Sequence, residues 1–89
     1  MIERKDYVNL ASSSFIGAYY KAREIHAPMQ SLHEGYAIIK EEFDELWDEI
    51  KRYPNHKNSD VRKEAIQMGA MIIAFLVEAA PVDGHDKSS

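Results

Sequence analysis

The sequence predicts an all-α protein with three helices, and three observations lead to this fold class. Apolar residues recur every three or four positions through most of the 89-residue chain, which is the spacing of a helical face. Prolines at positions 28, 54 and 81 divide the chain into three such segments. The chain is shorter than a usual domain, so we expect one domain over residues 1–80 and a flexible tail over residues 81–89.

The first helix is expected over roughly residues 3–25. Its apolar positions form a single helical stripe, which the polar run at residues 12–14 weakens in the middle. The stripe consists of Tyr7, Val8, Ala11, Phe15, Ala18, Tyr19, Ala22 and Ile25. This pattern predicts one amphipathic helix.

The second helix is expected over residues 31–53. Ser31 and Glu34 have the spacing of a capping box, in which each side chain accepts a hydrogen bond from a free backbone N–H. The most regular apolar stripe of the chain follows, and it consists of Leu32, Tyr36, Ile39, Phe43, Leu46, Trp47 and Ile50. We interpret the aromatic members of this stripe as core residues, namely Tyr36, Phe43 and Trp47.

The third helix is expected to begin after Ser59 or Asp60 and to end near residue 80. Residues 68–77 are apolar or glycine on every side of this helix, yet ten residues are too few to span a bilayer, which needs about 20. Such a helix must be buried all round, and two neighbours from one chain do not cover it. We therefore expect a homodimer or homotetramer with a four-helix-bundle-type core. Gly69 is expected to mark a close approach between helices.

Composition and charge exclude several classes of protein. The 11 basic and 15 acidic residues give a net charge of 11 − 15 = −4, which disfavours sequence-independent binding to nucleic acid. Without cysteine there are neither disulfides nor thiolate metal sites. The charged start of the chain is not followed by an apolar segment, so we expect a cytoplasmic protein without a membrane partner.

Acidic residues are concentrated in the second predicted helix, where six of the nine residues from 41 to 49 are Asp or Glu. Successive residues turn by 100°, which places Glu41, Asp44 and Asp48 on the solvent side. The sector that holds Glu42, Glu45 and Glu49 also holds Ile38, so this sector is expected to face protein. Carboxylates that face protein must be protonated, paired with cations or bound to metal.

The third helix offers a second set of oxygen ligands in Glu64 and Gln67, which are three residues apart on one face. The short connection over residues 54–59 favours antiparallel packing of the second and third helices. Glu42 and Glu45 then lie at the level of this pair. Oxygen ligands favour hard cations, Mg²⁺ first and Mn²⁺ next.

These residues resemble a known family. Glu41-Glu42-Phe43-Asp44-Glu45 is similar to the EExxE motif of the MazG-like all-α nucleoside triphosphate pyrophosphohydrolases, and Glu64-Ala65-Ile66-Gln67 stands where that family has ExxD. The resemblance covers residues 31–80 and includes the short phage-type or stand-alone members. It implies a Mg²⁺-dependent hydrolase that converts NTP or dNTP to NMP and pyrophosphate, in house-cleaning of the nucleotide pool.

The resemblance also implies roles for individual residues. Glu42, Glu45 and Glu64 would be metal ligands, and Glu41 would bind another ion or orient the attacking water, so the implied catalytic set is Glu41, Glu42 and Glu45. Gln67 occupies the fourth ligand position, where a neutral amide binds a hard cation more weakly than the family's Asp. The basic and Asn-containing motif that full-length relatives carry after ExxD is missing.

Substrate binding is expected at His33 and Lys63. His33 has a second interpretation, as a residue of the capping box. The wider set of basic residues that are candidates for phosphate binding is Lys51, Arg52, Lys57, Arg62 and Lys63. Three alternatives stay open: the acidic run is only a solvated helix face, the chain is a degenerate binder of nucleotide or metal without turnover, or it is a helical oligomerisation or adaptor module.

Overall fold

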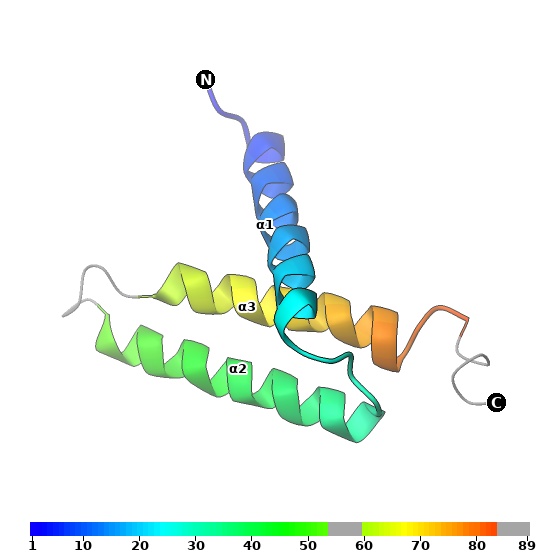
Figure 1. Ribbon diagram of the computed structural model, residues 1–89. Coiled ribbons are helices and arrows are strands. Elements are labelled where there is room, and N and C mark those ends of the chain that lie inside the picture. Colours follow the sequence, from blue (N-terminus) through cyan, green and yellow to red (C-terminus); the bar gives the residue numbers. More distant parts are fainter. Residues whose placement is uncertain (54–59, 84–89) are drawn as a thin grey trace.

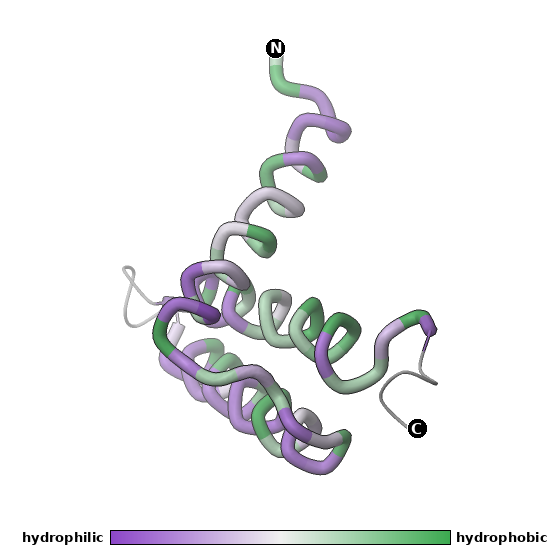
Figure 2. The backbone as a smooth tube through the Cα atoms, turned by 45° about the vertical axis from the view of Figure 1, so that its right-hand side comes forward, coloured by the Kyte–Doolittle hydropathy of each residue, from purple (hydrophilic) through white to green (hydrophobic). Residues whose placement is uncertain are grey.

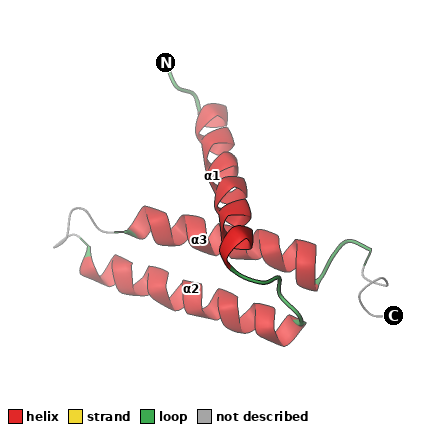
Figure 3. Ribbon diagram, viewed as in Figure 1, coloured by secondary structure: helices red, strands yellow, loops and turns green. Residues whose placement is uncertain are grey.

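The computed structural model describes residues 1–53 and 60–83, and all regular secondary structure in these ranges is helical (Figure 3). Helix α1 spans Arg4–Ile25, α2 spans Leu32–Arg52 and α3 spans Val61–Ala74. A π-helix, η1, continues α3 over Phe75–Ala79. The prediction of an all-α fold with three helices is confirmed, while the connection at 54–59 and residues 84–89 of the predicted tail lie outside the described residues.

Helix α3 is central, because both α1 and α2 contact it (Figure 1). Helices α2 and α3 run antiparallel side by side, as the short connection predicts. Helix α1 crosses α3, and its N-terminal half projects beyond the other two helices (Figure 1; Figure 2). Figure 2 shows that α3 is hydrophobic along most of its length, which explains its position between two neighbours.

Side-chain hydrogen bonds fix the start of α2 and join its end to α3. Ser31 Oγ accepts a hydrogen bond from Glu34 N at 3.0 Å, as predicted, but the Glu34 carboxylate accepts from Gln30 N rather than from Ser31 N. At the other end of α2, Glu49 accepts from Asp60 N at 3.1 Å. Because Asp60 is the N-cap residue of α3, this hydrogen bond joins the end of α2 to the start of α3.

The core of the protomer is small. Tyr19, Met29, Ala70 and Ala74 are its buried hydrophobic residues among those described. Partly buried side chains packed against them are Ala18, Ile38, Met71, Ile73, Phe75 and Ala79. On the uncovered side of α3 and η1, exposed apolar side chains remain at Ile72, Leu76 and Val77. Two neighbours from the same chain therefore leave this helix incompletely covered, as the sequence predicts.

The interpretation of the α2 aromatics as core residues is wrong for the single chain. Tyr36, Phe43 and Trp47 are 65%, 56% and 54% exposed. Helix α2 instead meets α3 and η1 through the neighbouring sector: Ile38 packs on the core, and a Cβ added to Gly35 would lie 2.6 Å from the Phe75 ring. The absence of a side chain at Gly35 allows this close approach, which rotates the aromatic stripe away from α3.

Gly69 marks a close helix approach, as expected. A Cβ added there would lie 2.5 Å from two atoms of the Phe15 ring, whereas nothing lies within 4 Å of a Cβ at Gly17 in α1. We expect Gly69→Ala to destabilise the fold, because an overpacking cost of about 1–3 kcal/mol exceeds the roughly 0.5–1 kcal/mol that alanine gains in a helix. Gly17→Ala is the matched control and should stabilise. Urea unfolding measures both, and equal stabilisation would contradict the close Phe15–Gly69 contact.

Candidate metal centre and adjoining pocket

Three carboxylates meet between α2 and α3. One oxygen each of Glu42, Glu45 and Glu64 lies within 4.8 Å of the other two. Glu42 and Glu45 are three residues apart on α2, and Glu64 lies in the first turn of α3. The antiparallel packing of the two helices thus brings these residues to one level, as the sequence predicts.

Over residues 1–53 and 60–83, the three carboxylates have no cationic partner, in contrast to the solvent-side acids of α2. Asp44 and Asp48 form ion pairs with Lys40 at 3.2 Å and Lys51 at 3.4 Å. Within the described residues, no Lys or Arg nitrogen lies within 4.0 Å of the carboxylates of Glu42, Glu45 or Glu64. The acids of α2 therefore fall into a solvated, paired group and a second group beside α3, in which Glu42 is half-buried like Glu64 of α3, whereas Glu45 is exposed.

Burial and like charge change the acidity of this second group. Burial, followed by the negative charge of Glu45, raises the pKa of Glu42 to about 7. Burial and Glu45 also raise the pKa of Glu64, although the positive charge of Lys63 opposes this rise. In addition, Glu42 Oε1 is buried and has no hydrogen-bond partner among the described residues. An orphaned carboxylate oxygen beside two further carboxylates fits a hard divalent cation, which would satisfy that oxygen and offset the repulsion.

A pocket of about 430 Å³ adjoins this cluster and shares Glu42 with it. Its volume lies within the range that small-molecule sites occupy. Residues from α1, the following loop, α2 and α3 line it: Ala22, Arg23, His26, Ala27, Met29, Glu34, Ile38, Glu41, Glu42, Gln67 and Met71. Glu41 and Gln67, both expected site residues, thus line the same pocket as Glu42. The other walls of this pocket are partly apolar.

A buried polar network holds the loop side of this pocket. Glu78 of η1 is only 7% exposed, and it accepts hydrogen bonds from Tyr19 Oη at 2.8 Å and Met29 N at 2.9 Å. Arg23 Nη1 lies 3.2 Å from the same carboxylate, and Arg23 Nη2 donates to Ala27 O at 3.0 Å. The hydrogen bond to Glu78 raises the pKa of Tyr19. These contacts tie the C-terminal end of α1 and the loop to η1.

The sequence analysis did not predict this network, although the sequence contains one indication of it. Glu78 is the only charged residue between positions 65 and 82, and it continues the spacing of four from Ala70 and Ala74. A charge on the buried stripe of an apolar helix requires a partner. The partners themselves come from α1 and the loop, far away in the sequence.

The remaining expected residues are distributed around the site. His33 is exposed on the first turn of α2 and is not among the residues that line the pocket, which favours its capping-box interpretation. Lys63 is exposed beside Glu64, close enough to affect its pKa. Lys51 and Arg52 pair with Asp48 and Glu49, and Lys57 lies outside the described residues.

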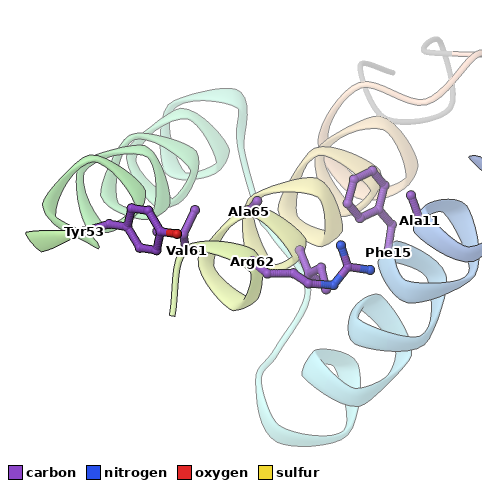
Figure 4. Close-up of a pocket in the computed structure, with 7 residues that line it drawn as sticks. Ala11, Phe15, Tyr53, Val61, Arg62 and Ala65 are labelled. Atoms are coloured by element: carbon purple, nitrogen blue, oxygen red, sulfur yellow. The ribbon is translucent and has the colours of Figure 1, made fainter. Parts of the chain in front are cut away.

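Arg62 is directed elsewhere. It lies in a separate pocket of about 420 Å³ and extends from α3 toward α1 (Figure 4). The other residues of this pocket are almost entirely apolar: Ala11, Phe15, Tyr53, Val61, Ala65 and Ile66. Of the basic candidates within the described ranges, Lys63 is therefore the one beside the carboxylate cluster.

Two further findings bear on identity. Among the described residues, no helix combines the length and the apolar character that crossing a bilayer requires. No family model matches the chain, no curated protein matches it and no solved structure matches it. The likeness to the MazG-like pyrophosphohydrolases therefore stays a prediction from the two short motifs at residues 41–45 and 64–67.

Proposed function

We propose that this chain hydrolyses nucleoside triphosphates, NTP or dNTP, to the monophosphate and pyrophosphate with Mg²⁺ as cofactor and Mn²⁺ as a substitute. One observation carries the proposal: three carboxylates that have no cationic partner among the described residues meet beside a pocket of about 430 Å³. The motif resemblance supplies the reaction type. Water attacks the α-phosphorus, the bond from the α-phosphorus to the α,β-bridging oxygen breaks, and pyrophosphate leaves.

Each acidic residue has a role in this proposal. Glu42, Glu45 and Glu64 would hold the cation, with Gln67 as a weaker neutral ligand. When bound, the cation neutralises phosphate charge and lowers the pKa of bound water. Glu41 lines the pocket beside Glu42, where its carboxylate would orient the attacking water and accept its proton.

The charges around the pocket determine the orientation of the substrate. Glu34, Glu41 and Glu42 all line it, and its one arginine, Arg23, is already paired with Glu78, so a triphosphate is repelled unless a cation accompanies it. The nucleoside is uncharged and would occupy the wall formed by Met29, Ile38 and Met71. The triphosphate would then extend to the carboxylate cluster and to Lys63. House-cleaning of the nucleotide pool is the proposed biological role.

The test is pyrophosphate release from a panel of canonical and modified NTPs and dNTPs, with Mg²⁺, Mn²⁺ or chelator. We expect release only with metal, and we expect Glu45→Gln and Glu64→Gln to lower kcat/KM by at least roughly tenfold, since even outer-shell substitutions cost about 10–100-fold. Asp44→Asn is the matched control, because it removes one charge from the same helix at a solvent-side position paired with Lys40. It should retain full activity.

Calorimetric titration separates the alternatives if no pyrophosphate appears. Metal-dependent nucleotide binding that Glu45→Gln abolishes would identify a degenerate binder. Absence of both metal and nucleotide binding would contradict the proposed function and leave the adaptor interpretation. Loss of activity in Asp44→Asn equal to that in Glu45→Gln would show that the cluster has no special role.

A further inference from the structure

Of the carboxylates that line the pocket within the described residues, Glu34 is the one to which the proposed reaction gives no role. Glu42 would hold the cation and Glu41 would orient the attacking water, whereas Glu34 lines the same pocket from the first turn of α2. Its Oε1 accepts a hydrogen bond from Gln30 N, and its second carboxylate oxygen has no partner among the described residues. The backbone thus fixes this carboxylate and leaves one of its oxygens free to accept from a ligand.

The spacing of residues along α2 separates Glu34 from the carboxylate cluster. Glu34, Ile38 and Glu42 follow one another at intervals of four, so they share one face of the helix, and all three line the pocket. At 1.5 Å per residue, Glu34 lies about 12 Å along the helix axis from Glu42, with Ile38 between them. A nucleoside that packs on Ile38, with its triphosphate extending to Glu42, therefore turns the far edge of its base toward Glu34.

Three side chains that line the pocket can donate hydrogen bonds, and none of them opposes the preference that Glu34 imposes. Arg23 is paired with Glu78 and donates to a backbone carbonyl of the loop, while its Nε is buried. His26 and Gln67 can each donate or accept, so neither distinguishes a donor from an acceptor on a base. An ionised carboxylate only accepts. Glu34 therefore selects for a base that carries a donor on its far edge.

We propose that Glu34 accepts a hydrogen bond from the exocyclic amino group of the base, so that cytosine and adenine nucleotides are preferred to those of uracil, thymine and hypoxanthine. The inference rests on the proposed function, because it takes the triphosphate to lie at the carboxylate cluster. The amino group of cytosine or adenine lies on the edge opposite the sugar, where the other three bases carry a carbonyl oxygen. Carboxylates accept from the amino group of cytosine in this way, whereas a carbonyl oxygen would face the carboxylate with no hydrogen between them.

Two pairs of substrates test this preference, since dCTP and dUTP, like dATP and dITP, differ by an amino group against a carbonyl at this edge. The quantity measured is kcat/KM for pyrophosphate release with Mg²⁺. We expect the wild-type chain to favour the amino member of each pair by about tenfold. Glu34→Gln should lower both ratios to about one or below, because its amide keeps an oxygen for Gln30 N and offers an N–H to the carbonyl of the base.

The ratio within a pair separates recognition from stability, because a weaker fold or weaker metal binding lowers the rates of both members alike. Asp44→Asn is the matched control, since it removes a solvent-side acid of the same helix that pairs with Lys40, and it should leave both ratios unchanged.

The outcomes distinguish this inference from the proposed function. Turnover without an amino preference overturns the inference and leaves the proposed function intact, as does an amino preference that Glu34→Gln retains. If none of the four nucleotides is hydrolysed, the proposed function fails. The ratios of their dissociation constants, measured by calorimetric titration with Mg²⁺, then decide the inference in the same way. Absence of binding by all four nucleotides overturns both.

Discussion

Replacing Glu78 with alanine is expected to lower the free energy of unfolding by about 3–5 kcal/mol, the usual cost of removing one partner of a buried ion pair. The substitution leaves Arg23 without its carboxylate and removes the acceptor of Tyr19 Oη and Met29 N. A domain of 89 residues has a total stability of roughly 4–13 kcal/mol. We therefore expect this one carboxylate to account for a large fraction of the fold's stability.

Two further variants distinguish the network from a single contact. Tyr19→Phe removes one hydrogen bond and should cost about 1 kcal/mol. Glu78→Gln keeps an acceptor for Met29 N but loses the negative charge, so its effect should fall between the other two. Urea unfolding followed by far-ultraviolet circular dichroism measures all three. A Glu78→Ala protein as stable as the wild type would show that the network contributes nothing to the fold.

The metal-free protein is expected to lose stability as pH rises from about 5 to 8. The direction of this change follows from the raised pKa of Glu42. Its pKa is about 7 in the folded chain against an ordinary value of 4.5, so the folded state holds this proton more tightly than the unfolded state. The resulting stabilisation is complete below pH 4.5 and is lost by the time the pH has passed 7. Glu64 shifts in the same direction. With solvent screening, the loss is about 1–2 kcal/mol.

Mg²⁺ is expected to reverse this loss, because a cation binds the ionised carboxylates and not their protonated forms. At 100 times its dissociation constant it should add about 2.7 kcal/mol at pH 8 and much less at pH 5. Thermal melts at both pH values, with and without metal, measure the difference. Glu42→Gln should flatten the pH dependence and abolish the metal effect, whereas Asp44→Asn should change neither. If Mg²⁺ and Mn²⁺ both leave the pH 8 melting temperature unchanged, the cluster is not a metal site.

Much of the carboxylate cluster is predictable from the sequence, because it depends on local regularities. A rise of 1.5 Å and a turn of 100° per residue place Glu42 and Glu45 in one sector of α2. The short connection then leaves antiparallel packing as the simple arrangement for the next helix, which brings Glu64 to the same level. Ile38, an apolar residue in an acidic sector, is enough to indicate that this sector faces protein.

The sequence by itself determined the three helices, their approximate ends and the level at which Glu42, Glu45 and Glu64 meet. Only the tertiary structure decided that the aromatic stripe of α2 lies away from α3, since an amphipathic pattern shows how wide an apolar surface is but not which neighbour covers it. Close approach at Gly35 rotates the aromatic stripe outward. The structure likewise decided the partners of Glu78, because contacts between residues 49 and 59 positions apart depend on the crossing of α1 over α3, for which local periodicity holds no information.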